Sequence, residues 1–311
     1  MRVVSLLPSA TEILYALGVE PVAVSHECDY PPAAQGRPAA NESRIDPDAA
    51  SERVNEQVAS AESEGGIYRL REGVLREADP DLILTQGVCD VCAIDDQLVR
   101  TAVENLGLDA DVLTVHPHEL DDVFEDVLRI GSQTGNEKRA TELVATLRDR
   151  VRTVRQRVTA DGRRVAVLDW MDPVMIAGHW IPGMVETAGG RYGMADPGER
   201  SRPRPFDDLR AYDPEVLVAA PCGFPLERTV EHIGELTDRD GFDELTATKE
   251  GAVYAMDGHH HVNRPGPRLV DTLEHLAGIL QSETFDAPPR NVVRRVGPRH
   301  EIREQYGGRQ L

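Results

Sequence analysis

Short runs of valine, isoleucine and leucine alternate along the chain with longer stretches whose apolar residues recur at helical spacing. Each run has the length of a buried strand. The alternation is typical of helices packed around mostly parallel sheets, so it predicts an α/β protein. The runs that predict strands are residues 3–7, 22–25, 82–85, 112–115, 165–168, 174–177, 216–219 and 253–256.

One long segment, residues 119–160, breaks the alternation. It contains no strand candidate and no proline, and its apolar spacing predicts a long helix with a kink or break at Gly131 and Gly135. Because stretches of similar size flank it, we expect this helix to join two lobes. The predicted boundaries are residues 1–118 for the N-terminal α/β lobe, 119–161 for the connecting helix, 162–281 for the C-terminal α/β lobe and 282–311 for a flexible tail.

The two lobes share a short sequence pattern. Residues 79–89 and 213–222 each begin with Asp-Pro and an acid, continue with an apolar run and end in a cysteine. This pattern fits a structural repeat, and it fits equally well the chance recurrence of a common α/β loop.

The charge of the chain bears on its partners. With 34 Lys+Arg against 54 Asp+Glu the formal net charge is -20, which argues against a phosphate-binding surface and against nucleic acid as a partner. Lys138 and Lys249 are the two lysines, and this acidic, arginine-rich composition resembles that of haloarchaeal proteins. The charge therefore indicates a habitat rather than a ligand.

No window of the sequence approaches the 18 to 20 apolar residues of a membrane span, and the first residues predict a strand and a helix start instead of a signal peptide. We therefore expect no membrane insertion and a cytoplasmic location with reduced thiols. A start of the chain at another position would make the protein membrane-associated or extracellular.

Every cysteine follows a predicted strand. Cys28, Cys89, Cys92 and Cys222 are too few and too unevenly spaced for a disulfide scaffold. Since carboxyl ends of parallel strands share one edge of a sheet, ligands bind there in α/β folds. Three interpretations stay open: a site for a metal ion of unknown identity, a redox dithiol at Cys89 and Cys92, and inert thiols.

Histidines and aromatic residues gather in the same loops of a chain that is only 5% aromatic. Aromatic side chains concentrated at strand ends suggest a flat or apolar ligand, although ordinary packing explains any single one of them. His259 and His261 share a face if their segment is extended, and a solvated loop is the alternative. The residues singled out in this way are His26, Tyr30, Trp170, His179, Trp180, Phe224 and His259.

Ser9 and Thr11 lie just after the first predicted strand. The segment Ser9-Ala-Thr-Glu12 has the spacing of a capping box before a helix over residues 13–17. The backbone donors of such a helix start would face a ligand, and a plain helix cap is the alternative.

Common enzyme signatures are missing from the sequence. It has no GxSxG, no GxxxxGK[ST], no GxGxxG after a strand and no HExxH. No nucleophile with a positioned base is identified, so we expect a binding protein and not an enzyme.

Four segments resemble the class III substrate-binding proteins of ABC importers. They are RVVSLLPSATEILYALG at 2–18, DPDLIL at 79–84, AGG at 188–190 and RPGPRLVD at 264–271, and the resemblance spans roughly residues 1–280. Members of that family take up cobalamin, haem and iron-siderophore chelates. The resemblance implies two Rossmann-like lobes with parallel sheets, joined by one long α-helix, with a metal chelate between the lobes and an ABC permease as partner.

Within that family the chain is similar to the subgroup labelled cobalamin-binding. The motifs are HECDYP at 26–31, VCDVC at 88–92, GHW at 178–180 and APCG at 220–223. The resemblance implies that Glu72 and Asp207 dock on the permease, although both fit ordinary surface acids. Strand ends and resemblance together predict ligand-binding roles for Ser9, Thr11, His26, Tyr30, Trp170, His179, Trp180, Phe224, His259 and Arg264, with Cys28, Cys89, Cys92 and Cys222 as candidate metal ligands.

Two functional interpretations follow. The first is a non-enzymatic protein that holds cobalamin or another metal chelate, with an imidazole from His26 or His179 on cobalt and with Trp180 and Phe224 against the corrin. The second is an intracellular soft-metal-binding protein or thiol oxidoreductase that uses the cysteines.

Overall fold

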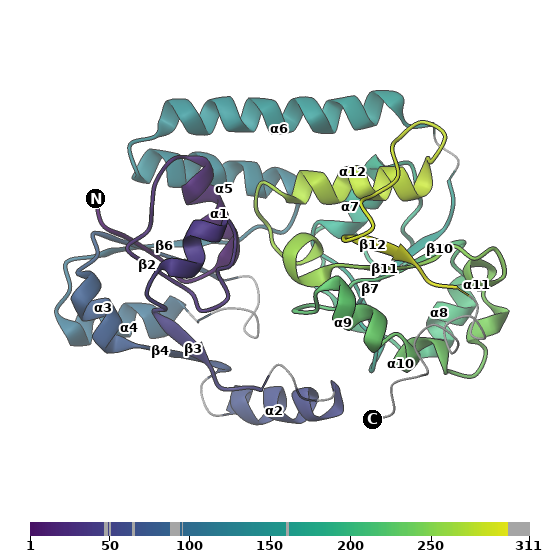
Figure 1. The fold of residues 1–311 in the computed structure, drawn as a ribbon, viewed down its shortest axis with the longest axis horizontal. Coiled ribbons are helices and arrows are strands. Elements are labelled where there is room, and N and C mark those ends of the chain that lie inside the picture. Colours follow the sequence, from purple (N-terminus) through teal and green to yellow (C-terminus); the bar gives the residue numbers. More distant parts are fainter. Residues whose placement is uncertain are drawn as a thin grey trace. The chain divides into compact units, whose positions relative to one another are not determined.

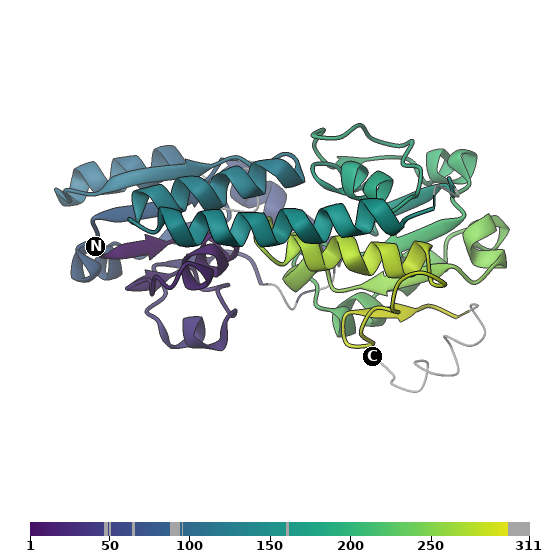
Figure 2. The same cartoon turned by 90° about the horizontal axis from the view of Figure 1, so that it is seen from above.

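The computed structural model describes residues 1–46, 49, 51–63, 66–87, 94, 96–159 and 162–297. The chain divides into two compact units, which are shown in Figure 1. Unit 1 comprises Met1–Pro117 and Asp121–Thr146, and unit 2 comprises His118–Leu120 and the chain from Leu147 onward. The last passage from unit 1 to unit 2 falls inside one continuous helix, α6 (Glu137–Arg157), which is seen along its length in Figure 2.

Unit 1 is built on a parallel sheet of four strands in the order β2-β1-β5-β6. A separate antiparallel ribbon pairs β3 with β4. The elements of unit 1 before α6 are β1 (Val3–Ser5), α1 (Pro8–Ala16), β2 (Ala23–Val24), η1 (Pro32–Gly36), β3 (Asn41–Ser43), α2 (Ser51–Ser63), β4 (Tyr68–Leu70), α3 (Glu72–Ala78), β5 (Leu82–Gln86), α4 (Asp96–Leu106), β6 (Asp111–Val115) and α5 (Leu120–Gln133).

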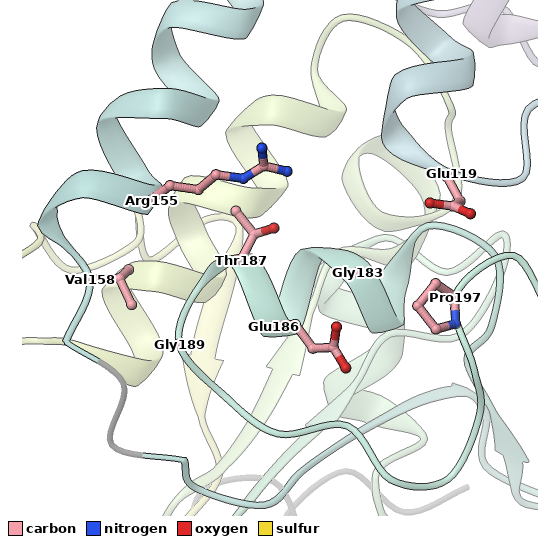
Figure 3. A pocket seen from close by; sticks show the side chains of 8 residues that line it. All are labelled: Glu119, Arg155, Val158, Gly183, Glu186, Thr187, Gly189 and Pro197. Atoms are coloured by element: carbon pink, nitrogen blue, oxygen red, sulfur yellow. The ribbon is translucent and has the colours of Figure 1, made fainter.

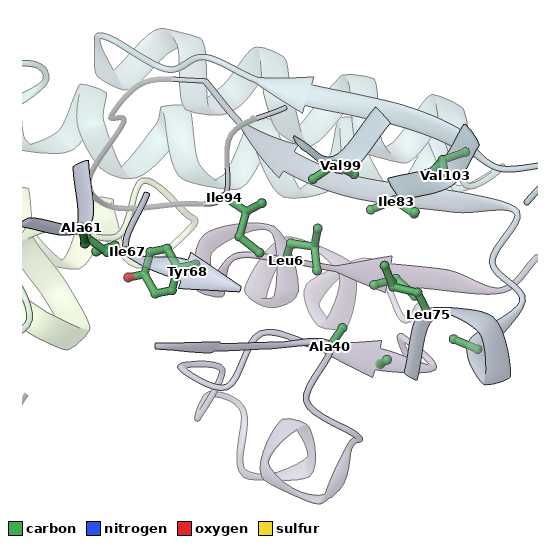
Figure 4. Packing of buried hydrophobic residues seen from close by; sticks show 13 residues of the cluster. Leu6, Ala40, Ala61, Ile67, Tyr68, Leu75, Ile83, Ile94, Val99 and Val103 are labelled. Atoms are coloured by element: carbon green, nitrogen blue, oxygen red, sulfur yellow. The ribbon is translucent and has the colours of Figure 1, made fainter. Parts of the chain in front are cut away.

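The core of unit 1 follows from side-chain alternation along its strands. Leu6 and Ile83 point to one face of the sheet, where they pack with Leu75 of α3 and Val99 of α4 (Figure 4). The same cluster takes in Tyr68 from β4, so the β3–β4 ribbon is packed onto this face. Helices α1 and α5 lie on the other face (Figure 1). Buried on both faces, the strands have the continuous apolar sequences that predicted them.

Unit 2 contains a mixed sheet of six strands in the order β12-β11-β10-β7-β8-β9. Helices α7 and α12 pack together on one face and α9 lies on the other (Figure 1). The elements after α6 are β7 (Val165–Trp170), β8 (Met175–Ile176), α7 (Ile181–Thr187), β9 (Arg202–Pro203), α8 (Phe206–Tyr212), β10 (Val216–Ala219), α9 (Leu226–Glu231), α10 (Gly234–Thr237), η2 (Phe242–Glu244), α11 (Thr246–Lys249), β11 (Val253–Met256), η3 (Gly258–Val262), α12 (Leu269–Leu280) and β12 (Val293–Arg295).

The α/β class is confirmed, and each of the eight predicted strand segments contains a strand. In unit 2 the central strands β7, β10 and β11 are parallel, but β8, β9 and β12 are antiparallel to their neighbours. The connection from β7 to β8 spans only residues 171–174, too few for the crossover that a parallel pair requires. The segment predicted as a tail contains β12, which pairs with β11.

The predicted long helix consists of α5 and α6, with a break between them. Gly135 takes a left-handed conformation at φ 69°, and the backbone N–H of Asn136 donates to the carbonyl of Gly131 at 2.7 Å. A Cβ on Gly131 would lie 2.4 Å from the Cβ of Ala140, so this glycine permits the close approach of the two helices. The break therefore falls where the glycines predicted it.

The capping prediction at Ser9 is wrong. Helix α1 already begins at Pro8, and its N-cap residue, Leu7, makes no side-chain capping bond. Proline is favoured at the first helical position because its φ angle is fixed near the helical value. Ser9, Thr11 and Glu12 consequently lie inside the helix and are buried.

Candidate functional site

In unit 1, the strand-end residues Thr11 and Cys28 form a buried contact. The Thr11 hydroxyl lies 2.8 Å from Ser5 Oγ and 3.0 Å from Cys28 Sγ. Cys28 is only 4% exposed and packs with Val24 and Ala34. Within unit 1 this thiol is part of the interior, as a small apolar side chain would be.

His26, the second residue after β2, is held by a network of polar side chains. Asn41 Oδ1 accepts a hydrogen bond from the His26 backbone N–H at 2.9 Å and lies 3.0 Å from its ring Nδ1. Glu27 Oε1 is 3.9 Å from the ring Nε2 and accepts a hydrogen bond from the Tyr68 hydroxyl at 3.1 Å. The His26 side chain is 26% exposed, so the network leaves the imidazole accessible.

Three other predicted site residues belong to unit 1: Tyr30, Cys89 and Cys92. Tyr30 is 44% exposed, which suits a side chain that contacts a ligand. Cys89 and Cys92 lie outside the described residues, and their proposed metal-binding role stays a prediction.

His116 follows β6, and a Cβ on Gly87 would lie 1.9 Å from its ring, so only glycine fits there. The other histidines were selected because they follow a predicted strand, and the same criterion would have selected His116.

In unit 2, Trp170 and Phe224 form an aromatic pair at the ends of β7 and β10. Their rings meet edge to face with centroids 5.1 Å apart. The Arg228 guanidinium lies over the Phe224 ring at 4.2 Å, and the Trp170 indole N–H donates to the carbonyl of Asp172. Cys222, in the same loop, is half-buried and is a thiol. Phe224 is only 4% exposed, so it packs in the interior against Trp170, and the half-buried Trp170 is the ring of this pair that solvent reaches at the strand ends.

Asp169, which the sequence analysis missed, lies beside this pair. Its Oδ1 is buried and, among the residues that the structure describes, has no hydrogen-bond partner. Burial raises the pKa of Asp169, while hydrogen bonds from Ser201 and Asn263 oppose the shift. An acid at the end of the apolar strand sequence VAVLDW was the available signal.

His179 occupies a strained position next to Trp180. It is left-handed, with φ 51°, and its ring stacks on Trp180 at 5.4 Å and lies 5.9 Å from the ring of His118. Burial, followed by the nearby His118 and Arg200, lowers the pKa of His179 to about 4. Trp180 is only 8% exposed, and its indole N–H donates to the carbonyl of Val262. Trp180 therefore has the environment of a core residue rather than of a ligand cover.

The three consecutive histidines do not form an extended segment. They lie in the π-helical turn η3, capped by Asp257, whose carboxylate accepts from the His260 backbone N–H at 2.7 Å. His259 Nε2 lies 2.7 Å from an Arg264 guanidinium nitrogen, so it accepts from that group, and Arg264 is only 4% exposed. His261 instead lies against His275, with ring centroids 5.6 Å apart. The expected common face of His259 and His261 depended on an extended backbone that the turn replaces.

The two candidate docking acids occupy matching places in the two units. Glu72 lies in the first turn of α3 and Asp207 in the first turn of α8, and both are exposed. Asp207 forms an ion pair with Arg210 at 3.1 Å.

A pocket of about 540 Å³ in unit 2 contains none of the predicted site residues. It lies beside α7 and the end of α6, and its walls carry two acids, one arginine and no aromatic side chain (Figure 3). Ligand pockets are usually lined by apolar and aromatic groups, so the strand ends are the better candidate site. The lining residues are Glu119, Arg155, Val158, Gly183, Glu186, Thr187, Gly189 and Pro197.

Two α/β units with candidate residues at their strand ends are typical of a ligand-binding protein. Residues 3–259 match the periplasmic binding protein family, and the chain belongs to this family. None of the helices in the described ranges is both long and apolar enough to span a membrane.

Known proteins extend this comparison. The chain is 28% identical to a cobalamin-binding protein of Halobacterium salinarum over 171 residues, which cover 53% of this chain and 46% of that protein. It thus spans about half the length of that relative. It is 25% identical over 295 residues to the uncharacterized ABC transporter substrate-binding lipoprotein YvrC of Bacillus subtilis, covering 91% of this chain and 81% of YvrC. A periplasmic haem-binding protein of Pseudomonas aeruginosa shares the fold, with a TM-score of 0.69 at 18% identity over 95% of this chain and 99% of that one.

The prediction of a cytoplasmic location is wrong. The family is that of periplasmic binding proteins, and YvrC is a lipoprotein. The prediction depended on the first residues of the sequence, which carry no information on what precedes them.

Proposed function

We propose that this chain is the substrate-binding component of an ABC importer and that its substrate is a metal chelate of the cobalamin or haem kind. The observation that carries the proposal is the family match over residues 3–259, together with the similarity to a cobalamin-binding protein over 171 residues. The protein acts outside the cytoplasm, delivers its substrate to a permease and performs no chemistry on it.

The chemistry of the strand ends supports a large, flat substrate. In unit 2, the half-buried Trp170 meets the buried ring of Phe224 at 5.1 Å, and Arg228 lies over Phe224, so Trp170 is an aromatic group held in place beside polar groups. In unit 1, His26 is accessible and Tyr30 is 44% exposed. Within each unit, aromatic side chains beside a few polar groups suit a macrocycle with polar substituents.

The binding proposal is tested by titrating the purified protein with aquocobalamin, iron(III) protoporphyrin and a ferric trihydroxamate, followed by tryptophan fluorescence and calorimetry. We expect aquocobalamin or the porphyrin to bind with one-to-one stoichiometry. Absence of binding for all three probes at about 100 micromolar would contradict the proposed function. Binding at that concentration requires a favourable binding free energy of only about 5 to 6 kcal/mol.

Phe224→Ala supplies the structural test, with Phe285→Ala as its matched control. Arg157 lies over Phe285 at 4.7 Å, as Arg228 lies over Phe224 at 4.2 Å, so both variants remove a phenyl ring that a guanidinium covers. Because Phe224 is buried and Phe285 is half-buried, the thermal unfolding of both variants is measured and binding is compared at a temperature where both are folded. Loss of a ring contact worth about 1.5 kcal/mol weakens binding roughly tenfold in Phe224→Ala. Equal losses in both variants would show that the effect is on folding rather than on the site.

We further propose that Glu72 and Asp207 contact arginines of the permease. Both are exposed first-turn acids of corresponding helices, one in each unit. Glu72→Arg with Asp207→Arg should abolish uptake in cells and leave substrate affinity unchanged. Glu77→Arg with Asp208→Arg, exposed acids of the same two helices, is the control.

The thiol-based alternative is not favoured, because the family consists of binding proteins and Cys28 is packed in the interior of unit 1. Metal analysis of protein purified under reducing conditions distinguishes the two functions. Stoichiometric zinc or copper without chelate binding would revive the alternative.

A further inference from the structure

We infer that His26 supplies an axial ligand to the metal of the bound chelate through Nε2. Asn41 orients the His26 ring and fixes its tautomer. The inference rests on the proposed function and narrows it: the substrate has a metal with an exchangeable axial position, as in haem iron or aquocobalamin.

The tautomer of His26 follows from its contacts. Asn41 Oδ1 accepts from the His26 backbone N–H at 2.9 Å, and a backbone N–H is always a donor, so this atom of Asn41 is the carbonyl oxygen. The same oxygen lies 3.0 Å from the ring Nδ1, which must therefore carry the proton. A neutral imidazole protonated on Nδ1 has its lone pair on Nε2, the atom that binds a metal.

The ring is also fixed in position. Asn41 is 1% exposed and belongs to β3, so the acceptor is part of the packed ribbon rather than of a loop. The Tyr68 ring of β4 lies 5.6 Å from the imidazole and holds Glu27 through its hydroxyl. A ring that is oriented before binding loses little freedom when it coordinates a metal.

Asn41 occupies Nδ1 of His26, which leaves Nε2 as the nitrogen for a metal. Within the described part of the chain it makes no hydrogen bond; the Glu27 carboxylate, its nearest acidic neighbour, is 3.9 Å away. The side chain is 26% exposed and directly follows a strand end, where ligands of this fold class bind. His259 differs, because Arg264 occupies its Nε2.

Coordination by His26 is a ligand exchange without oxidation or reduction. The metal–water bond breaks, the water leaves, and a bond forms from the Nε2 lone pair to the metal while the proton stays on Nδ1. A ferric ion enclosed by a hexadentate trihydroxamate has no exchangeable position, so it gains nothing from His26. Cyanocobalamin, whose two axial positions are filled, gains nothing either.

Absorption spectra of the full chain with aquocobalamin, together with absorption and electron paramagnetic resonance spectra with iron(III) protoporphyrin, test the inference. Wild type should show an imidazole nitrogen in place of the exchangeable axial water, and His26→Gln should keep the axial water and bind with affinity lower by about tenfold or more. Cyanocobalamin should bind both proteins equally.

Two variants of Asn41 test its positioning role. Asn41→Asp keeps an acceptor for both N–H groups and should keep the nitrogen-ligated spectrum, because carboxylates commonly orient metal-bound histidines. Asn41→Leu removes the acceptor and should give a mixture of nitrogen- and water-ligated metal. Identical spectra for Asn41→Leu and wild type would overturn this role.

His232→Gln is the matched competitor. The His232 side chain is 27% exposed and its Nδ1 pairs with Glu235 at 2.8 Å, but it follows α9 and not a strand. Loss of the nitrogen signature in His232→Gln but not in His26→Gln would overturn the inference. If wild type binds the chelate but the metal keeps its axial water, the inference about His26 is overturned and the proposed function stands. If wild type binds no chelate at all, the proposed function itself is wrong.

Discussion

Asp79 and Asp213 have the same left-handed backbone conformation at the same place in the two units. Their φ angles are 42° and 47°, and each ends a seven-residue helix by donating its backbone N–H to the carbonyl four residues earlier. Each is followed by a proline and a parallel strand, β5 or β10. The shared Asp-Pro pattern therefore corresponds to a repeated helix–strand corner.

The two aspartates differ in what their side chains do, and glycine substitution should reveal it. The Asp213 carboxylate accepts from the backbone N–H and the hydroxyl of Thr246, both at 2.8 Å, whereas within the described chain Asp79 makes no side-chain hydrogen bond. Glycine relieves left-handed strain at both positions. We expect Asp79→Gly to change the free energy of unfolding by less than about 1 kcal/mol and Asp213→Gly to lower it by about 1 to 2 kcal/mol.

The pH dependence separates the two positions further. The hydrogen bonds from Thr246, first the backbone one, lower the pKa of Asp213 in the folded protein. Its stabilising effect is therefore complete above the unfolded pKa near 4 and is lost as the pH falls through the folded value. Urea unfolding at pH 7 and pH 3 should show a smaller effect of Asp213→Gly at pH 3; an equal effect would contradict the assignment.

Much of the fold could be predicted because buried parallel strands have continuous apolar sequences. β10 and β11 have the predicted bounds, whereas β3, β4, β9 and β12 were missed. β9 consists of Arg202–Pro203, both exposed, and β3 of Asn-Glu-Ser, so neither has an apolar pattern. Such strands form because a neighbouring strand offers its edge, which is a tertiary effect.

Glycines near the candidate site lead to a second prediction. A Cβ on Gly258 would lie 2.1 Å from the carbonyl oxygen of Pro221, and the Gly258 N–H donates to the carbonyl of Phe224. Gly258→Ala must push η3 away from the loop that carries Cys222 and Phe224, at a cost of about 1 to 3 kcal/mol. We expect a lower thermal midpoint and weaker chelate binding.

Gly183→Ala is the control for this prediction. Gly183 lies inside α7, and a Cβ there would meet no atom within 4 Å. Alanine is favoured over glycine in a helix by about 0.5 to 1 kcal/mol, so this variant should be more stable than wild type. Destabilisation by both substitutions would show that the close approach at Gly258 is not the cause.

Asp126 gives a third prediction. It lies in α5, is 4% exposed and accepts a hydrogen bond from Arg129 at 2.9 Å. Burial raises the pKa of Asp126 to about 6, against the opposing effect of Arg129. The contribution of Asp126 to stability is therefore greatest below the unfolded pKa near 4 and is lost as the pH rises through 6, because the folded protein must then hold a buried charge.

Asp126→Asn should remove this pH dependence. We expect the variant to exceed wild type by about 1 to 3 kcal/mol at pH 8 and to match it near pH 4, measured by urea unfolding. Asp121→Asn, an exposed acid of the same helix, is the control. A difference that does not grow between pH 5 and pH 8 would show that the charge of Asp126 is compensated in the fold.

The candidate site was only partly accessible to sequence reasoning. The strand-end rule selected His26 and Phe224, but their partners come from elsewhere in the chain. Asn41 lies 15 residues after His26, in a strand without an apolar pattern, and Tyr68 reaches Glu27 across 41 residues. Trp180 and Phe224 were selected for their aromatic rings, yet both are buried, because motif and loop position do not determine which way a side chain points.

The pair of His261 and His275 leads to the last prediction. The two rings are 5.6 Å apart, and the Nδ1 of His261 is buried with no hydrogen-bond partner among the described residues. Burial lowers the pKa of His261 to about 4, with Asp257 and Asp271 opposing the shift and Arg268 and His275 adding to it. Burial also lowers the pKa of His275.

Because the folded pKa lies below the unfolded value of about 6.5, the unfolded chain binds more protons than the folded protein at pH values between the two. The contribution of this pair to the free energy of unfolding should therefore be greatest above pH 6.5 and fall continuously toward pH 4. His275→Phe keeps a ring of similar size against His261 but removes one of the two groups, so its stability should fall less steeply over this range. Urea unfolding at pH 7.5, 6, 5 and 4 measures the slope for both proteins. His261→Gln should flatten it further, because the group with the larger shift is removed. Slopes equal to that of wild type in both variants would mean that neither imidazole has a lowered pKa in the folded protein.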